Sequence, residues 1–150
     1  MAIAAGINIF TGNRADAGLG TALTNPMVLS QKKGTIARAY PVVFQGRTYP
    51  DAETCFQALK HSRYSGPVPN VDLQLLQVII AHKLLQHETL YNAIAQRGSV
   101  EWLQRCWHRT AARTPAYQWW EGEGMSSPMI RCLVKGYALA QQSRDQSAGN

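Results

Sequence analysis

The stretch GRTYPDAETCFQALKHS, residues 46–62, holds a carboxylate, an amide and an amine at spacings that a helix would gather on one face. A helix turns about 100° per residue, so Glu53, Gln57 and Lys60 would fall within roughly 60° of one another. That face could support acid–base or electrostatic chemistry, with Glu53 as the reactive group. It could also be the solvated side of a helix whose first turn carries an acid that the helix dipole stabilises. The pattern alone favours the solvated side.

An early glycine-rich loop offers polar groups of a different kind. Thr24 and Asn25 precede Pro26 in this loop. An asparagine amide can both donate hydrogen bonds to and accept them from a base or a ribose edge. The same residues also suit an Asx-type turn before the proline, which is the more common role of such a sequence.

A later loop contains two neighbouring tryptophans followed by an acid and a glycine. Trp119 and Trp120 precede Glu121 and Gly122 in the stretch RTAARTPAYQWWEGEGMSS. An exposed indole plane can stack on a nucleobase, whereas a buried indole simply fills a core. Long loops in compact domains are often functional, so we treat both tryptophans as candidates for ligand contact.

Length and composition limit the classes of protein to consider. The chain has 150 residues, 45% of them apolar, which predicts one globular domain with its own core. No apolar run is long enough to span a bilayer, so we expect no membrane association. The net charge of +6 favours anionic partners, although it could also serve only solubility.

The cysteine pattern indicates a reducing compartment. There are three cysteines, Cys55, Cys106 and Cys132, and no pair has C-x-x-C spacing. An odd number without such pairs argues against a disulfide framework and against a structural zinc site. We therefore expect a cytoplasmic protein without a metal.

The local patterns predict a mostly helical α+β domain with a small antiparallel sheet. Val42-Val43-Phe44 and Arg47-Thr48-Tyr49 flank Gln45-Gly46, which predicts a hairpin. A helix capped by Asp51 should follow, with Ala52, Cys55, Phe56 and Leu59 on its apolar side. The other expected elements are a short strand at 7–10, an irregular arm or short helix at 30–40, helices at about 72–86 and 88–97, with Asp72 as a cap and Gly98 closing the second of them, an ambiguous segment at 99–107, and a last helix with Ser127 as N-cap and Pro128 as its first residue. Residues 15–21, 1–6 and 143–150 should be loose.

These stretches together resemble the NADAR family, also called the YbiA-like family. The most specific match is Tyr49-Pro50-x-x-Glu53-x-x-x-Gln57-x-x-Lys60, which corresponds to the family's YPSVEHAYQAxK motif. Looser matches follow the family's order: the loop Leu23-Thr24-Asn25-Pro26, the helix with Lys83, Gln86, His87 and Leu90, and the loop Trp120-Glu121-Gly122-Glu123-Gly124. The likeness covers about residues 7–137. The chain departs from the family where Glu121 replaces a glycine and where GMSSPMI replaces GxNxLG.

The resemblance implies a YbiA-like fold and an N-glycosidase that hydrolyses an N-ribosyl bond without a metal or organic cofactor. The implied substrate is nucleotide-like or ADP-ribosylated, and it could be part of a nucleic acid. The resemblance places Glu53 and Lys60 in catalytic positions, with Lys60 either a phosphate ligand or an amine nucleophile. Substrate contacts would come from the following residues: Thr24, Asn25, Gln57, Trp119, Trp120, Glu121 and Gly122. The alternatives are a non-catalytic module that binds ADP-ribose or a nucleotide, and a basic nucleic-acid-binding protein.

Overall fold

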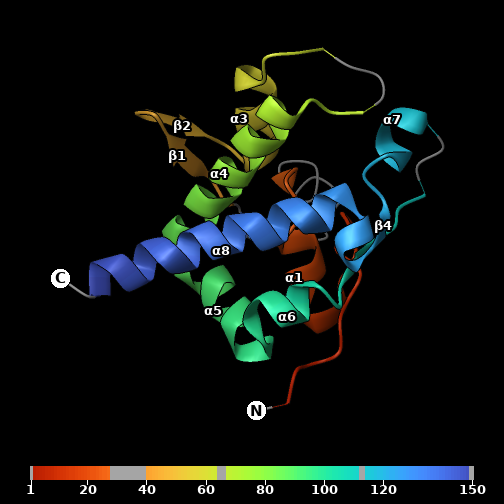
Figure 1. Ribbon diagram of the computed structural model, residues 1–150, viewed down its shortest axis with the longest axis vertical. Helices are drawn as coiled ribbons and strands as arrows, with labels where there is room; N and C mark the ends of the chain where they lie inside the picture. Colours follow the sequence, from red (N-terminus) through yellow and green to blue (C-terminus); the bar gives the residue numbers. More distant parts are fainter. Residues whose placement is uncertain (1, 28–39, 64–66, 112–113, 149–150) are drawn as a thin grey trace.

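The computed structural model describes residues 2–27, 40–63, 67–111 and 114–148, and it confirms the predicted α+β class (Figure 1). Most described residues are helical, and the strands form two small two-stranded antiparallel sheets, β1–β2 and β3–β4. The elements are α1 (Ala15–Ala22), β1 (Val42–Phe44), β2 (Arg47–Tyr49), α3 (Ala52–Leu59), α4 (Asn70–Gln86), α5 (Glu88–Arg97), α6 (Ser99–Leu103), β3 (Trp107–His108), α7 (Pro115–Gln118), β4 (Gly122–Glu123), the 3-10 helix η1 (Gly124–Ser126) and α8 (Pro128–Ala148). The predicted segment 30–40 lies outside the described residues except for Tyr40.

Two long helices, α4 and α8, cross at the centre of the molecule (Figure 1). Their backbones approach closely at Gly136, where an added Cβ would lie 2.6 Å from Ile80 Cγ2 and 3.1 Å from the carbonyl oxygen of Gln77. Such distances are shorter than van der Waals contact, so only glycine fits this crossing. One apolar core surrounds the two helices, and it includes residues from α1, both strands of the hairpin, α3, α5 and α6.

The hairpin β1–β2 forms in the predicted register, with Val42 opposite Tyr49 and Phe44 opposite Arg47. Both turn residues, Gln45 and Gly46, have positive φ angles of 50° and 79°. This is the geometry that two-residue hairpin turns prefer, since it matches the twist of the strands. The glycine at the second position therefore has a conformational reason.

The C-terminal end of α4 holds this hairpin in place through side chains. Gln86 accepts a hydrogen bond from Val43 N and donates one to Val43 O, both at 2.8 Å, as a neighbouring strand would. His87 Nε2 donates to Pro41 O at 2.6 Å. The hairpin therefore enters α3 from a fixed position.

Helix α3 begins where the sequence predicts. Asp51 Oδ1 accepts a hydrogen bond from Thr54 N at 2.7 Å, which caps the helix, and Cys55 and Phe56 are buried as expected. The prediction that Asp72 also caps a helix is wrong, because α4 begins at Asn70 and Asp72 lies inside its first turn. Asp72 instead accepts hydrogen bonds from the backbone N–H groups of His61 and Ser62, which fixes the chain after α3.

The chain ends are more ordered than the sequence suggests. Ala4 N donates to Arg97 O and Trp102 Nε1 donates to Ala5 O, both at 2.9 Å, so the start of the chain is attached to α5 and α6. At the other end α8 continues through Ala148, because Arg144 stacks on Tyr91 and pairs with Glu88. The expectation of loose ends at 1–6 and 143–150 is therefore corrected for residues 2–6 and 143–148.

Three other expectations need correction. Residues 15–21, expected to be loose, lie within α1, which is kinked by left-handed backbone at residues 16–18 and is held by two hydrogen bonds from Arg97 to Asp16. The segment 7–10 forms only a bridge from Asn8 to Trp107 instead of a strand of its own. The ambiguous segment at 99–107 divides into a short helix and a strand, α6 and β3, and the long loop after it contains α7, β4 and η1.

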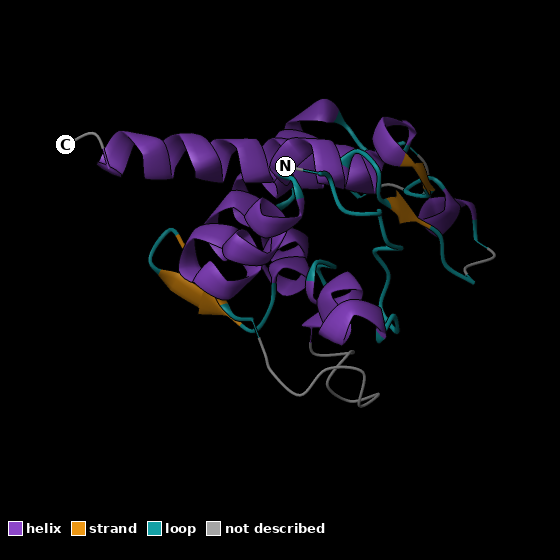
Figure 2. Cartoon of the chain, turned by 90° about the horizontal axis from the view of Figure 1, so that it is seen from below, coloured by secondary structure: helices purple, strands orange, loops and turns teal. Residues whose placement is uncertain are grey.

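The start and end of α5 and the start of α8 agree with the predictions. Gly98 follows Arg97 with a φ of 132°, and Ser127 Oγ accepts a hydrogen bond from Ile130 N at the start of α8. Figure 2 shows α8 extending past the other helices toward the C-terminus. Among the described residues, no helix combines the length and the apolar character needed to cross a membrane.

The close crossing at Gly136 gives a prediction about stability. A Gly136→Val substitution would force α4 and α8 apart and should lower the free energy of unfolding by about 1–3 kcal/mol, as overpacked core substitutions do. Urea denaturation measures this change. The matched control Ala138→Val, on the exposed side of α8, should change stability by at most about 0.5 kcal/mol. A neutral or stabilising effect of Gly136→Val would show that the helices can separate freely.

Candidate functional site

The loop that contains Asn25 lies directly against the first turn of α3. Glu53 N donates a hydrogen bond to Asn25 O at 3.2 Å. The first backbone N–H groups of a helix have no partner within the helix, so an outside carbonyl is well placed here. Two segments that are 28 positions apart in the sequence are thereby brought together, and with them two of the predicted site residues.

The Glu53 carboxyl is half-buried at this junction. Its Oε1 accepts a hydrogen bond from Gln57 Nε2 at 2.7 Å, one helical turn further on. Burial raises the pKa of Glu53 above its ordinary value, and the negative charge of Asp51 adds to this, whereas the Gln57 hydrogen bond and the charge of Lys60 oppose it. Glu53 and Gln57 share a helix face as predicted, whereas Lys60 lies just past the end of α3 with extended backbone and acts on Glu53 through its charge.

The two polar atoms of the Asn25 side-chain amide differ in their contacts. Only 7% of Asn25 is exposed. Its Nδ2 points to Met129 Sδ at 3.8 Å, while its buried Oδ1 has no hydrogen-bond donor among the described residues. A buried carbonyl oxygen without a partner costs about 1–3 kcal/mol. A ligand with a donor group would satisfy this atom only by reaching into the buried loop.

A buried lysine fixes the loop that carries Asn25. Lys83 is 2% exposed, and its Nζ donates to Ala22 O and Thr24 O, both at 2.7 Å. Burial lowers the pKa of Lys83 to about 7, while the negative charge of Asp51 acts in the opposite direction. The amine therefore links α4 to the loop from inside the protein.

Thr24, which we expected to contact substrate, is part of this structural arrangement. It is only 3% exposed, and its Oγ1 donates to Thr21 O at 2.6 Å. Its carbonyl oxygen accepts from Lys83. The described contacts of Thr24 thus support the loop and point to no ligand.

The tryptophan loop approaches the asparagine loop through one residue. Met129, which contacts Asn25 Nδ2, donates its backbone N–H to Trp120 O at 3.4 Å. Trp120 is partly buried against the core, and the Trp119 ring lies edge-on to it, with centroids 5.1 Å apart. Trp120 therefore has a packing role, and its backbone is one residue away from the Asn25 loop.

Glu121 and Gly122 make their contacts elsewhere. Glu121 Oε2 accepts hydrogen bonds from Thr110 N at 2.6 Å and Thr110 Oγ1 at 2.7 Å, and Gly122 pairs with His108 between β3 and β4. The burial of the Glu121 carboxyl raises its pKa, but the two Thr110 hydrogen bonds outweigh this and lower it overall. The described contacts do not bring these two residues to Glu53.

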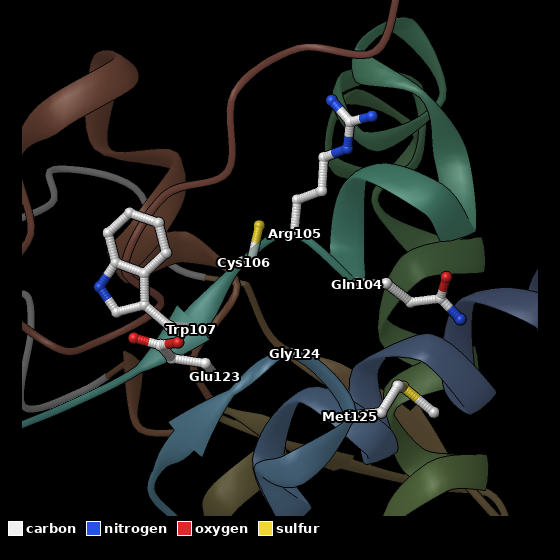
Figure 3. Close-up of a pocket in the computed structure, with 7 residues that line it drawn as sticks. All are labelled: Gln104, Arg105, Cys106, Trp107, Glu123, Gly124 and Met125. Carbon is white, nitrogen blue, oxygen red and sulfur yellow. The ribbon is translucent and has the colours of Figure 1, made fainter.

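Two cavities among the described residues stand out, and Glu53 does not line either of them. The first, of about 540 Å³, lies between β3 and η1 (Figure 3). Figure 3 shows Trp107 and Glu123 side by side at one edge and Gln104 with Met125 at the other. The second, of about 430 Å³, lies between α4 and α8. Within the described ranges, no group of three or more His, Cys, Asp or Glu side chains could hold a metal ion.

Comparison of the chain with protein-family models, with curated proteins and with solved structures finds no match. The account of this site therefore depends on its geometry.

Sequence analysis assigned Lys83 only to a helix motif and missed its position under the site. A signal was present, because Leu76, Ile79, Ile80 and Leu84 form the buried side of α4. Lys83 lies on that side, where the helical period requires an apolar residue. A lysine in such a place needs buried acceptors, which the Asn25 loop supplies.

The lowered pKa of Lys83 predicts a pH-dependent stability. Unfolded, the lysine keeps its proton up to a pKa of 10.5, but the native amine loses it near pH 7. Unfolding thus takes up a proton between these values, so the free energy of unfolding should increase with pH, by at most about 1.4 kcal/mol per pH unit.

The test is urea denaturation at several pH values between 7 and 9 for the wild type and Lys83→Met. The stability of the wild type relative to this variant should increase with pH. The exposed-lysine control Lys135→Met should retain the slope of the wild type. Identical slopes in the wild type and Lys83→Met would contradict the description of Lys83 as a buried amine with a lowered pKa.

Proposed function

We propose that the protein is an N-glycosidase that hydrolyses an N-ribosyl bond of a nucleotide-like or ADP-ribosylated substrate. One observation carries the proposal: the half-buried Glu53 carboxyl lies beside the Asn25 loop and accepts a hydrogen bond from Gln57. These residues are also the ones that resemble the NADAR family. A carboxyl held at the edge of a buried polar loop suits a reaction that places positive charge on a sugar.

In the proposed reaction, positive charge develops on ribose C1 as the C1–N bond breaks. The Glu53 carboxylate stabilises this charge and takes a proton from the attacking water. The water oxygen bonds to C1, and the electron pair of the broken bond leaves with the nitrogen. The proton on Glu53 then passes to that nitrogen, which releases the free base. A carboxyl whose pKa burial has raised is suited to hold a proton between these steps.

The neighbouring groups have complementary roles in this proposal. The buried Oδ1 of Asn25 accepts a hydrogen bond from a ribose hydroxyl, which removes its unsatisfied state. Gln57 orients the carboxyl of Glu53. Lys60, whose charge acts on Glu53, holds a phosphate of the substrate. Lys83 is enclosed and bound to two carbonyls, so it positions the loop instead of contacting substrate.

A second candidate is a module that captures ADP-ribose or a nucleotide without cleaving it. The contacts of Glu121 and Gly122 with residues 108–110 favour this candidate. They separate part of the predicted substrate-binding loop from Glu53. Binding of ADP-ribose by the wild type, with no base released over hours from an ADP-ribosylated guanine oligonucleotide, would select this candidate.

Glu53→Gln tests the catalytic role directly. The variant should fold normally but lose turnover by about 10²–10³-fold, the typical effect of removing one such group. Mass spectrometry would follow release of base or ADP-ribose from an ADP-ribosylated guanine oligonucleotide and from a phosphorylated ribosylaminopyrimidine. The control Glu101→Gln, at an exposed acid on α6, should keep the wild-type rate. Equal rates in Glu53→Gln and the wild type would remove Glu53 from the mechanism.

The pH dependence of the rate gives a separate test. Glu53 acts as a carboxylate, and burial raises its pKa. The value of kcat/KM should therefore fall with decreasing pH, with a midpoint above the ordinary glutamate pKa of about 4.3. The residual activity of Glu53→Gln should lack this acid limb. An unchanged limb in the variant would assign the titration to another group.

A further inference from the structure

The two central helices enclose a polar groove that is separate from Glu53. From their contact at Gly136, α4 and α8 diverge toward their N-terminal ends (Figure 1). Between them lies the cavity of about 430 Å³. It is lined on α4 by Asn70, Leu73, Gln74 and Gln77, and on α8 by Pro128, Arg131, Cys132 and Lys135. On both helices the lining residues are spaced three or four positions apart, so they lie on the helix face that borders the groove.

The α8 wall of this groove carries two positive charges without a carboxylate beside them. Arg131 and Lys135 are one helical turn apart, so their side chains are neighbours. Neither takes part in an ion pair within the described ranges, and no acidic residue lines the cavity. Arg131 is also half-buried, which weakens the screening of its charge by water.

The charges and amides meet at the floor of the groove, where Cys132 lies. Burial raises the pKa of the Cys132 thiol to about 11, and Arg131, the Gln77 side chain and Lys135 all oppose this increase. Both cations therefore act on the same interior point. The amides of Asn70, Gln74 and Gln77 on the α4 wall add neutral hydrogen-bond donors opposite them.

We propose that this groove is a binding site for the phosphate group of a small phosphate ester. A phosphate has several oxygens that can accept hydrogen bonds from both walls, and a guanidinium binds it through two N–H groups. The volume lies within the roughly 300–1,000 Å³ of small-molecule sites, so it exceeds what a bare ion needs. Leu73 and Pro128 supply apolar surface for the organic part of the ester. Glu53, Asn25 and Lys60 do not line this groove, so the binding proposal does not depend on the proposed activity.

Titration with adenosine 5′-monophosphate tests this site, with adenosine as the uncharged comparison. Calorimetry gives the Kd, and the side-chain amide signals of Gln74 and Gln77 in ¹H–¹⁵N spectra report the location. We expect adenosine 5′-monophosphate to bind and to shift both amide signals, and adenosine to do neither. Arg131→Gln and Lys135→Gln should each weaken binding by about tenfold, the effect of losing one charge-assisted hydrogen bond. The charge-matched control Arg47→Gln, on the hairpin, should stay within about twofold of the wild type.

Two further arms separate this site from other sources of binding. The Glu53→Gln variant should show the same Gln74 and Gln77 shifts, so failure of the glycosidase proposal leaves this one standing. A thymidine oligonucleotide distinguishes a polymer backbone from a small ester, and binding of the oligonucleotide alone would overturn the assignment. The proposal is also overturned if adenosine 5′-monophosphate does not bind, if Arg131→Gln and Lys135→Gln bind it normally, or if Arg47→Gln weakens binding to the same extent.

Discussion

One buried amine connects the centre of the fold to the candidate site. Lys83 extends from α4 and donates to Ala22 O and Thr24 O, which lie just before Asn25. Placing an amine in an apolar interior is unfavourable unless its N–H groups find acceptors. The two carbonyls meet that requirement, and the same two hydrogen bonds hold the loop in place against α4. One turn later, Gln86 and His87 fix the hairpin that leads into α3. The end of α4 thereby places both segments that meet at Glu53.

The site that results contains polar groups in unfavourable surroundings. Burial raises the pKa of Glu53, and Asn25 Oδ1 has no donor among the described residues. Buried polar groups that lack partners in the free protein are common at binding sites, where the ligand supplies the missing interactions. A ribose would supply hydroxyl donors to Asn25 and a developing positive charge to Glu53. The proposed reaction thus uses the features of this junction that stability alone does not explain.

The sequence predicted those parts of the structure that local interactions determine. The hairpin depends on Gln45-Gly46, and the start of α3 depends on Asp51, which caps a nearby N–H group. The face with Glu53 and Gln57 follows from the helical period alone. By contrast, the role of Lys83 depends on carbonyls about 60 positions away, and the fit at Gly136 depends on a second helix. Contacts over such separations leave no local pattern in the sequence. For the same reason the sequence placed Glu121 and Gly122 in the site, whereas the structure shows them in contact with Thr110 and His108.

The central claim is that Glu53 and Asn25 face the same sugar. A crystal structure of the protein soaked with ADP-ribose, the sugar product of the proposed reaction on an ADP-ribosylated substrate, tests it most directly, because the position of ribose C1 is then visible. The account predicts that ribose C1 lies against residue 53 and that a ribose hydroxyl donates to Asn25 Oδ1. Ordered ADP-ribose with its ribose elsewhere, such as in the groove between α4 and α8 or the cavity between β3 and η1, would contradict it.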